Sequence, residues 1–194
     1  MAENLTPRRL QAQRSRQDIV DAYRDLIRER GMDNFTVRDI CARLNISIGR
    51  FYHHFPSKDA VMEEFYFQFS SVIEQRLSRL PGGEPEGQLQ EFFACYCDFN
   101  TQLGLEFCQK FFSGTNHSFL SDKNSLPPIL HAIVERLLRQ RGLVGRYSAG
   151  ELTGYFHLLG RGVMLDWAIH NGSYDPRARM AQVISRGIAA LGAN

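Results

Sequence analysis

The side chains best suited to chemistry on a partner molecule gather in the segment between Thr36 and Lys58. Arg50 is the first candidate, because a guanidinium can bind the O6 and N7 atoms of guanine through two parallel hydrogen bonds. Arg38, on the outer side of the preceding predicted helix, is the second. The chemistry that this segment predicts is recognition of base edges in the major groove of DNA.

Two short helices joined by a tight turn are predicted to position these side chains. Apolar residues recur at helical spacing over 37–44, and Thr36 with Asp39 forms a weak variant of the capping box. Asn45 ends this helix, since Asn tolerates the left-handed conformation that a helix end requires. Ser47 then caps the second helix. The alternative is an ordinary helical hairpin with a solvated outer face.

The second helix is predicted to be amphipathic, with the residues of its first turn pointing deepest into the groove. That first turn holds Ser47, Ile48 and Gly49, and Gly49 leaves room for a partner to approach the backbone. The apolar face is predicted to comprise Ile48, Phe51, Tyr52 and Phe55. The polar face is predicted to comprise Arg50, His53 and His54. His53 is interpreted as a donor to DNA rather than as a metal ligand.

These residues resemble the signature of the tetracycline-repressor (TetR) family of bacterial regulators, T-V-x-x-I-A-x-x-x-G-V-S-x-G-x-x-Y-x-H-F-x-x-K. The matching residues are Thr36, Val37, Ile40, Ser47, Gly49, Tyr52, His54, Phe55 and Lys58. Cys41, Asn45 and Ile46 replace the family's usual Ala, Gly and Val, and all three suit the same local structure. The resemblance is specific over about residues 13–73 and architectural beyond them.

Helical periodicity along the chain predicts an all-α fold of about nine helices, and the resemblance implies two domains. A DNA-binding domain is expected over 13–73, with its helix-turn-helix at 36–55, and an effector-binding and dimerisation domain over 74–194. Thr36, Tyr52, His54 and Lys58 match family positions that hold the sugar-phosphate backbone. For Tyr52 the alternative is a core aromatic residue whose hydroxyl reaches the surface.

Composition agrees with a folded, partly basic chain. Its 194 residues are 43% hydrophobic, and the net charge is only +2. Positive charge is concentrated near the start, where an arm that attracts phosphate is predicted, with a flexible solubilising terminus as the alternative. The arginines concerned are Arg8, Arg9, Arg14 and Arg16.

Several classes of protein are disfavoured by what the sequence lacks. It shows no signal peptide and no apolar run long enough to cross a membrane, so a cytoplasmic location is expected. The four cysteines have no recognised disulfide or zinc spacing. No nucleophile motif, phosphate loop, metal cluster or carboxylate pair appears, so we expect neither an enzyme nor a cofactor or metal.

Helical periodicity continues through the remainder of the chain, and no strand is predicted. A first helix is expected to begin near Ser15 and end at Gly31, and a long helix is expected over 57–80. An aromatic helix follows, and then a polar connection over 116–128. Further helices are predicted over 128–141, over 148–170, and from Pro176 nearly to the C-terminus.

An aromatic helical face suggests a binding site for a small effector in the second domain. The family resemblance implies an apolar cavity among these helices, and the alternative is a solid aromatic core. The candidate ligand residues are Phe92, Phe93, Tyr96, Phe99, Phe107, Phe111, Phe112, Tyr155, His157 and Trp167. Cys95, Cys97 and Cys108 are interpreted as buried apolar residues, with a redox role for Cys97 and Cys108 as the alternative.

The last two long helices are predicted to form a homodimer, and completion of a monomer core is the alternative. The residues assigned to the interface are Leu152, Phe156, Leu159, Val163, Val183, Ile184 and Ile188. The chain is therefore predicted to be a dimeric, ligand-released repressor of a near-palindromic operator in double-stranded DNA. The alternative is a DNA-binding regulator without a small effector, controlled by a protein partner or by cysteine redox state.

Overall fold

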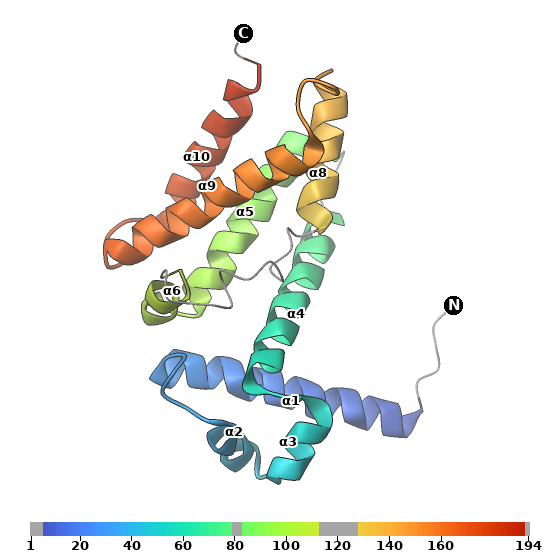
Figure 1. The fold of residues 1–194 in the computed structure, drawn as a ribbon, viewed down its shortest axis with the longest axis vertical. Coiled ribbons are helices and arrows are strands. Elements are labelled where there is room, and N and C mark those ends of the chain that lie inside the picture. Colours follow the sequence, from blue (N-terminus) through green and yellow to red (C-terminus); the bar gives the residue numbers. More distant parts are fainter. Residues whose placement is uncertain (1–5, 79–82, 113–127, 193–194) are drawn as a thin grey trace. The chain divides into compact units, whose positions relative to one another are not determined.

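The computed structural model describes residues 6–78, 83–112 and 128–192, and in these ranges the chain is helical (Figure 1). The helices are α1 (Pro7–Arg30), α2 (Val37–Leu44), α3 (Ile48–His54), α4 (Lys58–Ser78), α5 (Pro85–Gln102), α6 (Leu105–Phe111), α8 (Pro128–Gln140), α9 (Ala149–Ile169) and α10 (Pro176–Ala190). The described residues contain no strand beyond an isolated bridge between Val144 and Tyr147. The predicted all-α fold is confirmed.

The chain divides into two compact units, Met1–Gln68 and Phe69–Asn194. The division falls inside α4, as does the domain boundary predicted after residue 73, which stays a prediction. The predicted end of the long helix at 79–82 lies outside the described residues. The same holds for the predicted connection over 116–127.

In the first unit, α1 supplies a large part of the core. It begins at Pro7, where a missing N–H costs nothing in the first helical turn, and ends at Arg30, which Gly31 follows with φ 77°. Its apolar face packs with side chains of α2, α3 and α4. The buried residues of this core include Ile19, Tyr23, Leu26, Phe35, Ile40, Phe51, Phe55 and Val61.

The start of α1 corrects two predictions. The first helix does not begin near Ser15, because Pro7 permits helix formation eight residues earlier. Arg8, Arg9, Arg14 and Arg16 therefore all lie on α1 rather than on an extended arm.

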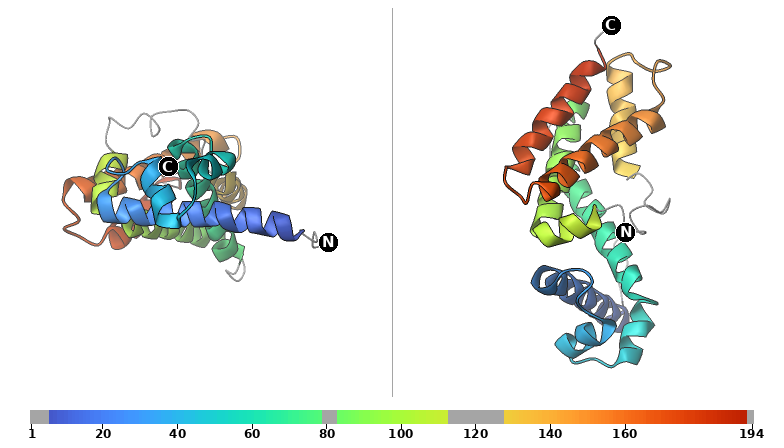
Figure 2. Two further views of the ribbon diagram at one scale, coloured as in Figure 1. Left: turned by 90° about the horizontal axis from the view of Figure 1, so that it is seen from below. Right: turned by 60° about the vertical axis from the view of Figure 1, so that its left-hand side comes forward.

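In the second unit, α5 lies alongside α10 and contacts α8 and α9 (Figure 2). Side-chain caps fix two helix starts: Ser148 Oγ accepts from the backbone N–H of Glu151, and Asp175 Oδ1 accepts from that of Arg177. At the contact between α5 and α9, Phe93 lies directly against Gly160. A Cβ atom at position 160 would lie 2.4 Å from the Phe93 ring, so this close approach requires glycine.

Candidate nucleic-acid interface

The turn between α2 and α3 is held by local hydrogen bonds that the residue types predict. The backbone N–H and the hydroxyl of Thr36 both donate to Asp39 Oδ2, at 2.7 Å each. These bonds, with a further contribution from Arg30, lower the pKa of the partly exposed Asp39 to about 2. Asn45 adopts the left-handed conformation, with φ 51° and ψ 46°. Ser47 Oγ then accepts from the backbone N–H of Arg50 at 3.2 Å, which caps α3.

One side of α3 is buried and the other is exposed, but the division differs from the predicted one. Phe51 and Phe55 are buried in the first unit. Ile48 and Tyr52 were predicted to share their face, yet both are exposed, because a helix of two turns can bury only one narrow stripe against α1. The alternative that placed Tyr52 in the core is therefore wrong. Nothing crowds Gly49, whose missing Cβ would have only Ser47 Oγ nearby, at 3.9 Å.

The predicted base-reading and polar residues lie on or beside this exposed side. Arg38 is exposed on α2, and Thr36, Ser47 and His53 are exposed as well. Arg50 is exposed, and its Nη2 donates to Ser15 Oγ on α1 at 2.9 Å. Ser15 did not figure among the predicted site residues, because a contact across 35 positions leaves no periodic signal in the sequence.

His54 is partly buried at the end of α3. Burial lowers its pKa, and the nearby His53, Arg50 and Arg16 lower it further. Its backbone carbonyl accepts a hydrogen bond from Arg16 Nη1 at 2.7 Å. These surroundings disfavour the charged form of the His54 imidazole.

Lys58 is turned inward, which fits the predicted phosphate contact poorly. Its ammonium donates to the carbonyls of Met32 and Phe35 at 2.7 and 2.8 Å, and it lies 3.8 Å from the centre of the Phe35 ring. Burial lowers the pKa of this amine. Lys58 therefore fastens the loop between α1 and α2 to the start of α4.

The predicted ligand residues of the second unit form mutual aromatic contacts. The Phe92 and Phe93 rings meet edge to face at 5.0 Å, and the Phe107 and Phe111 rings stack at 5.1 Å. Most of the set is buried. The buried members are Phe92, Phe93, Tyr96, Phe107, Phe111, Phe112 and Trp167. Phe99 and His157 are partly exposed and Tyr155 is exposed on α9, so Tyr155 does not share the buried cluster.

His157 is expected to make the stability of the second unit depend on pH. Burial, with a smaller effect of Arg161, lowers its pKa to about 4. Between that value and the unfolded value of about 6.5, the unfolded chain binds the proton and the folded chain does not, so stability falls as pH falls. The expected loss between about pH 7.5 and pH 5 is about 2 kcal/mol.

Urea unfolding followed by the fluorescence of Trp167, the single tryptophan of the chain, measures this loss. The variant His157→Gln should remove about 2 kcal/mol of the pH dependence. His53→Gln, which replaces an exposed histidine of the first unit, is the matched control. An undiminished pH dependence in His157→Gln would contradict the assignment.

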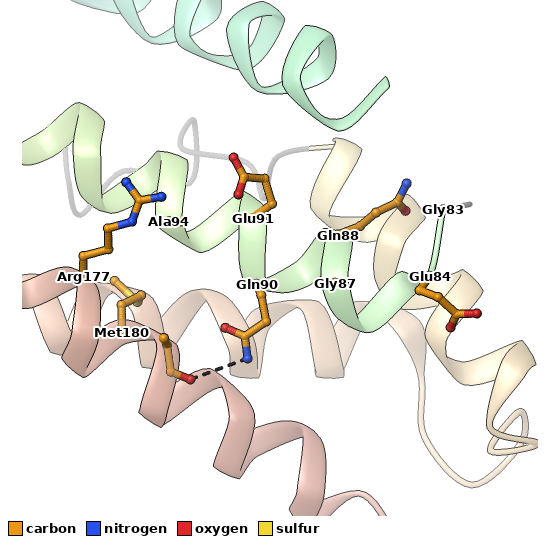
Figure 3. A pocket seen from close by; sticks show the side chains of 10 residues that line it. Gly83, Glu84, Gly87, Gln88, Gln90, Glu91, Ala94, Arg177 and Met180 are labelled. Carbon is orange, nitrogen blue, oxygen red and sulfur yellow. Dashed lines mark hydrogen bonds between the residues drawn. The ribbon is translucent and has the colours of Figure 1, made fainter. Parts of the chain in front are cut away.

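A hollow of about 310 Å³ lies between α5 and α10 (Figure 3). Glu91 and Gln90 line it from α5, and Arg177 and Met180 line it from α10. Gln90 Nε2 donates to the carbonyl of Ala181 at 3.5 Å. None of the predicted ligand residues lines this hollow, so it is separate from the aromatic cluster.

The predicted dimer residues require a correction, because most of them belong to the core of one protomer. Leu152, Phe156, Val163, Ile184 and Ile188 are buried. Leu159 and Val183 are partly buried, and Leu159 packs towards Gly187 of α10. The buried members of the stripe pack α9 and α10 within one protomer, which disfavours them as an interface. The assignment of the partly buried Leu159 and Val183 to a dimer interface stays a prediction.

The opposite face of α9 is apolar and exposed. Tyr155, Leu158, Leu165 and Ile169 are exposed, and the intervening Gly162 is exposed as well. Their spacing alternates between three and four residues, which is the a/d pattern of helices that pair with another helix. We call these five residues the outer α9 face.

The four cysteines are free and buried. Burial raises the pKa of Cys97 and of Cys108 to about 12, and it also raises the pKa of Cys95. Such thiols react slowly, because the thiolate is the reactive form. Within the described ranges, no group of three His, Cys, Asp or Glu residues is placed to share a metal ion, and no helix is long and apolar enough to cross a membrane.

The sequence of the first unit is similar to that of known bacterial regulatory proteins. Residues 19–65 match the family model described as bacterial regulatory proteins, tetR family. The HTH-type transcriptional regulator BetI of Klebsiella pneumoniae (strain 342) is 33% identical over 79 residues, and that of Escherichia coli (strain K12 / DH10B) is 34% identical over 79 residues. Each match covers 39% of this chain and 40% of the relative, so less than half of these relatives' length is matched.

Solved structures resemble the chain over almost its whole length. The TetR-family repressor FadR of Thermus thermophilus, in complex with lauroyl-CoA, has a TM-score of 0.63 at 20% identity and covers 91% of this chain and 92% of its own. FadR of Bacillus subtilis, in complex with stearoyl-CoA, has a TM-score of 0.68 at 15% identity, with coverages of 89% and 97%. A regulator from Syntrophomonas wolfei has a TM-score of 0.72 at 17% identity, with coverages of 93% and 96%. At these identities the likeness establishes the fold.

Proposed function

We propose that the chain is a transcriptional regulator of the tetR family, whose model matches residues 19–65, and that it binds operator DNA as a homodimer. The observation that carries this proposal is the exposed side of α3. Arg50 and His53 lie there beside an uncrowded Gly49, while Phe51 anchors the opposite side. An exposed, cationic helix on a rigid support suits insertion into a major groove.

The homodimer would use the outer α9 face in place of the stripe predicted from the sequence. Exposed apolar side chains in heptad spacing on one long helix are costly in water and pair favourably with a copy of themselves. A two-fold dimer would present two copies of α3 to successive major grooves, about 34–36 Å apart. The operator would then be a near-palindrome.

The proposed regulator represses transcription, and the binding of a small apolar or aromatic effector relieves this repression. Two solved structures of similar fold hold acyl-CoA, whose acyl chain is apolar, and the aromatic cluster around Phe92 and Phe107 is the apolar candidate site in this chain. Because α4 runs across the division between the units, a shift of α4 on effector binding would change the spacing of the two α3 helices. The dimer could then no longer occupy both half-sites.

A second candidate is a DNA-binding regulator that a protein partner controls. The contact of Phe93 with Gly160 favours it, because a ring packed against helix backbone leaves no room for a ligand at that point. Control by cysteine redox state is less well supported than control by a protein partner, because the cysteines are buried and burial raises the pKa of Cys97 and Cys108.

Selection from a pool of random DNA duplexes tests the proposal. We expect enrichment of a two-fold symmetric site whose half-site centres lie about 10 base pairs apart, or a multiple of that. Binding to the enriched site is then repeated with a long-chain acyl-CoA. Release of the DNA supports effector control, and unchanged binding with a set of acyl-CoA and aromatic compounds supports the protein-controlled regulator. Failure to enrich any site would contradict operator binding.

A further inference from the structure

The side chain of Arg50 is held at its far end by a residue of another helix. Its Nη2 donates to Ser15 Oγ of α1 at 2.9 Å, while its backbone N–H donates to Ser47 Oγ at 3.2 Å. A long arginine side chain in water loses considerable rotational freedom when it is ordered. The contact with Ser15 therefore limits where the guanidinium of an exposed arginine lies before it meets a partner.

The position of Ser15 relative to α3 is itself fixed by its neighbour, Arg16. The Arg16 guanidinium donates to the carbonyl of His54 at 2.7 Å and to Glu64 Oε2 at 2.6 Å, and it lies 4.1 Å from the centre of the Phe55 ring. Consecutive residues of α1 thus contact the beginning and the end of the exposed helix. These contacts hold α1 against α3, and so they place the Ser15 hydroxyl where it accepts the hydrogen bond from Arg50.

The hydrogen bond from Arg50 to the neutral Ser15 hydroxyl suits an arginine that must remain able to bind a base. Ser15 and Asp18 line the same hollow beside Arg50 and Asn45, at the turn between α2 and α3. A carboxylate at the position of Ser15 would hold the guanidinium through a charge-assisted bond, about twice as strong as a neutral one. A hydroxyl orients the guanidinium while leaving its remaining N–H groups available for a base.

We propose that Ser15 is a specificity-determining residue that positions Arg50 for its base contact. This inference rests on the proposed function, in which Arg50 reads a base of the operator. Ser15 acts through Arg50, so its contribution should appear in base discrimination and should vanish when Arg50 is absent.

The experiment measures the affinity of the full chain for the selected operator and for operators substituted at the base pair that Arg50 reads. Ser15→Ala should reduce the discrimination at that pair about 3- to 10-fold, as expected for loss of part of one bidentate contact. Affinity for unrelated DNA and the salt dependence of binding should not change, because no phosphate contact is removed. Ser15→Thr should retain the discrimination, and Ser15→Asp should reduce it by trapping Arg50.

Two comparisons make the result decisive. In the background of Arg50→Ala, the change Ser15→Ala should have no further effect on discrimination. An effect of equal size on all sequences that persists in that background would mean that Ser15 contacts the DNA itself, which would overturn the proposal. The exposed Ser173, in the turn after α9, supplies the control variant Ser173→Ala, and thermal melting of every variant monitors the fold.

Failure of this inference is distinguishable from failure of the proposed function. If Arg50→Ala loses discrimination and Ser15→Ala does not, only the positioning role is wrong. If neither variant changes discrimination at any base pair, Arg50 does not read a base. The roles assigned to Arg50 and to Ser15 are then both wrong.

Discussion

Replacing Arg50 with alanine is expected to reduce the affinity for the operator roughly 5- to 150-fold for each half-site, which corresponds to the 1–3 kcal/mol of the one bidentate guanine contact that each protomer loses. Arg50 is exposed near the start of α3, beside the uncrowded backbone of Gly49. Its hydrogen bond to Ser15 shows that the side chain reaches along the surface without pairing to an acid in the described structure. Affinity for unrelated DNA should change little, because phosphate contacts made elsewhere supply it.

Fluorescence anisotropy with labelled operator and unrelated duplexes measures both affinities. Arg139→Ala is the matched control, because Arg139 is an exposed arginine on α8 of the second unit. The base-reading role is wrong if Arg50→Ala weakens binding to both duplexes equally, since that pattern describes a phosphate contact. Arg38→Ala in the same assay ranks the second predicted base reader against the first.

Placing a glutamate at Leu158 is expected to convert the homodimer into monomers and to lower operator affinity about 100- to 10,000-fold. Leu158 is 66% exposed on the outer α9 face. In a two-fold dimer each carboxylate would be buried against an apolar surface, which is strongly unfavourable for an unpaired charge. Monomers would lose the high effective concentration that the second half-site provides.

Sedimentation velocity gives the oligomeric state, and anisotropy gives the operator affinity. Val144→Glu is the control, because Val144 is equally accessible, at 69%, but lies in the turn before α9. A Leu158→Glu protein that sediments as the parental dimer would exclude the outer α9 face as the interface. If both variants are dimeric and bind the operator, the dimer must form through another surface.

Features fixed by neighbouring residues were predictable from the sequence. The capping interaction of Thr36 with Asp39, the left-handed Asn45 and the cap formed by Ser47 each involve residues within three positions of one another. The helical class followed from periodicity for the same reason. A residue type and its spacing determine such interactions wherever the segment lies in the fold.

Helix orientation was harder to predict, because a short or evenly apolar helix has no single hydrophobic face. Ile48 and Tyr52 of α3 were assigned to the buried side and are exposed. On α9, apolar residues occur on both sides, and the stripe chosen for the dimer proved to be the one that packs within the protomer. The packing of α10, α8, α6 and α5 against α9 decides which stripe is covered.

The sequence alone determined that this chain is helical, where its capped helices begin, and which segment carries the helix-turn-helix. Local hydrogen bonds and apolar periodicity suffice for these properties. The tertiary structure decided that Lys58 turns inward to two carbonyls, that Ser15 holds Arg50, and that Leu158 lies outward. The contacts of Lys58 and Ser15 join residues that are far apart in the sequence, and the exposure of Leu158 requires that no other described element covers it. Spacing along the chain encodes neither property.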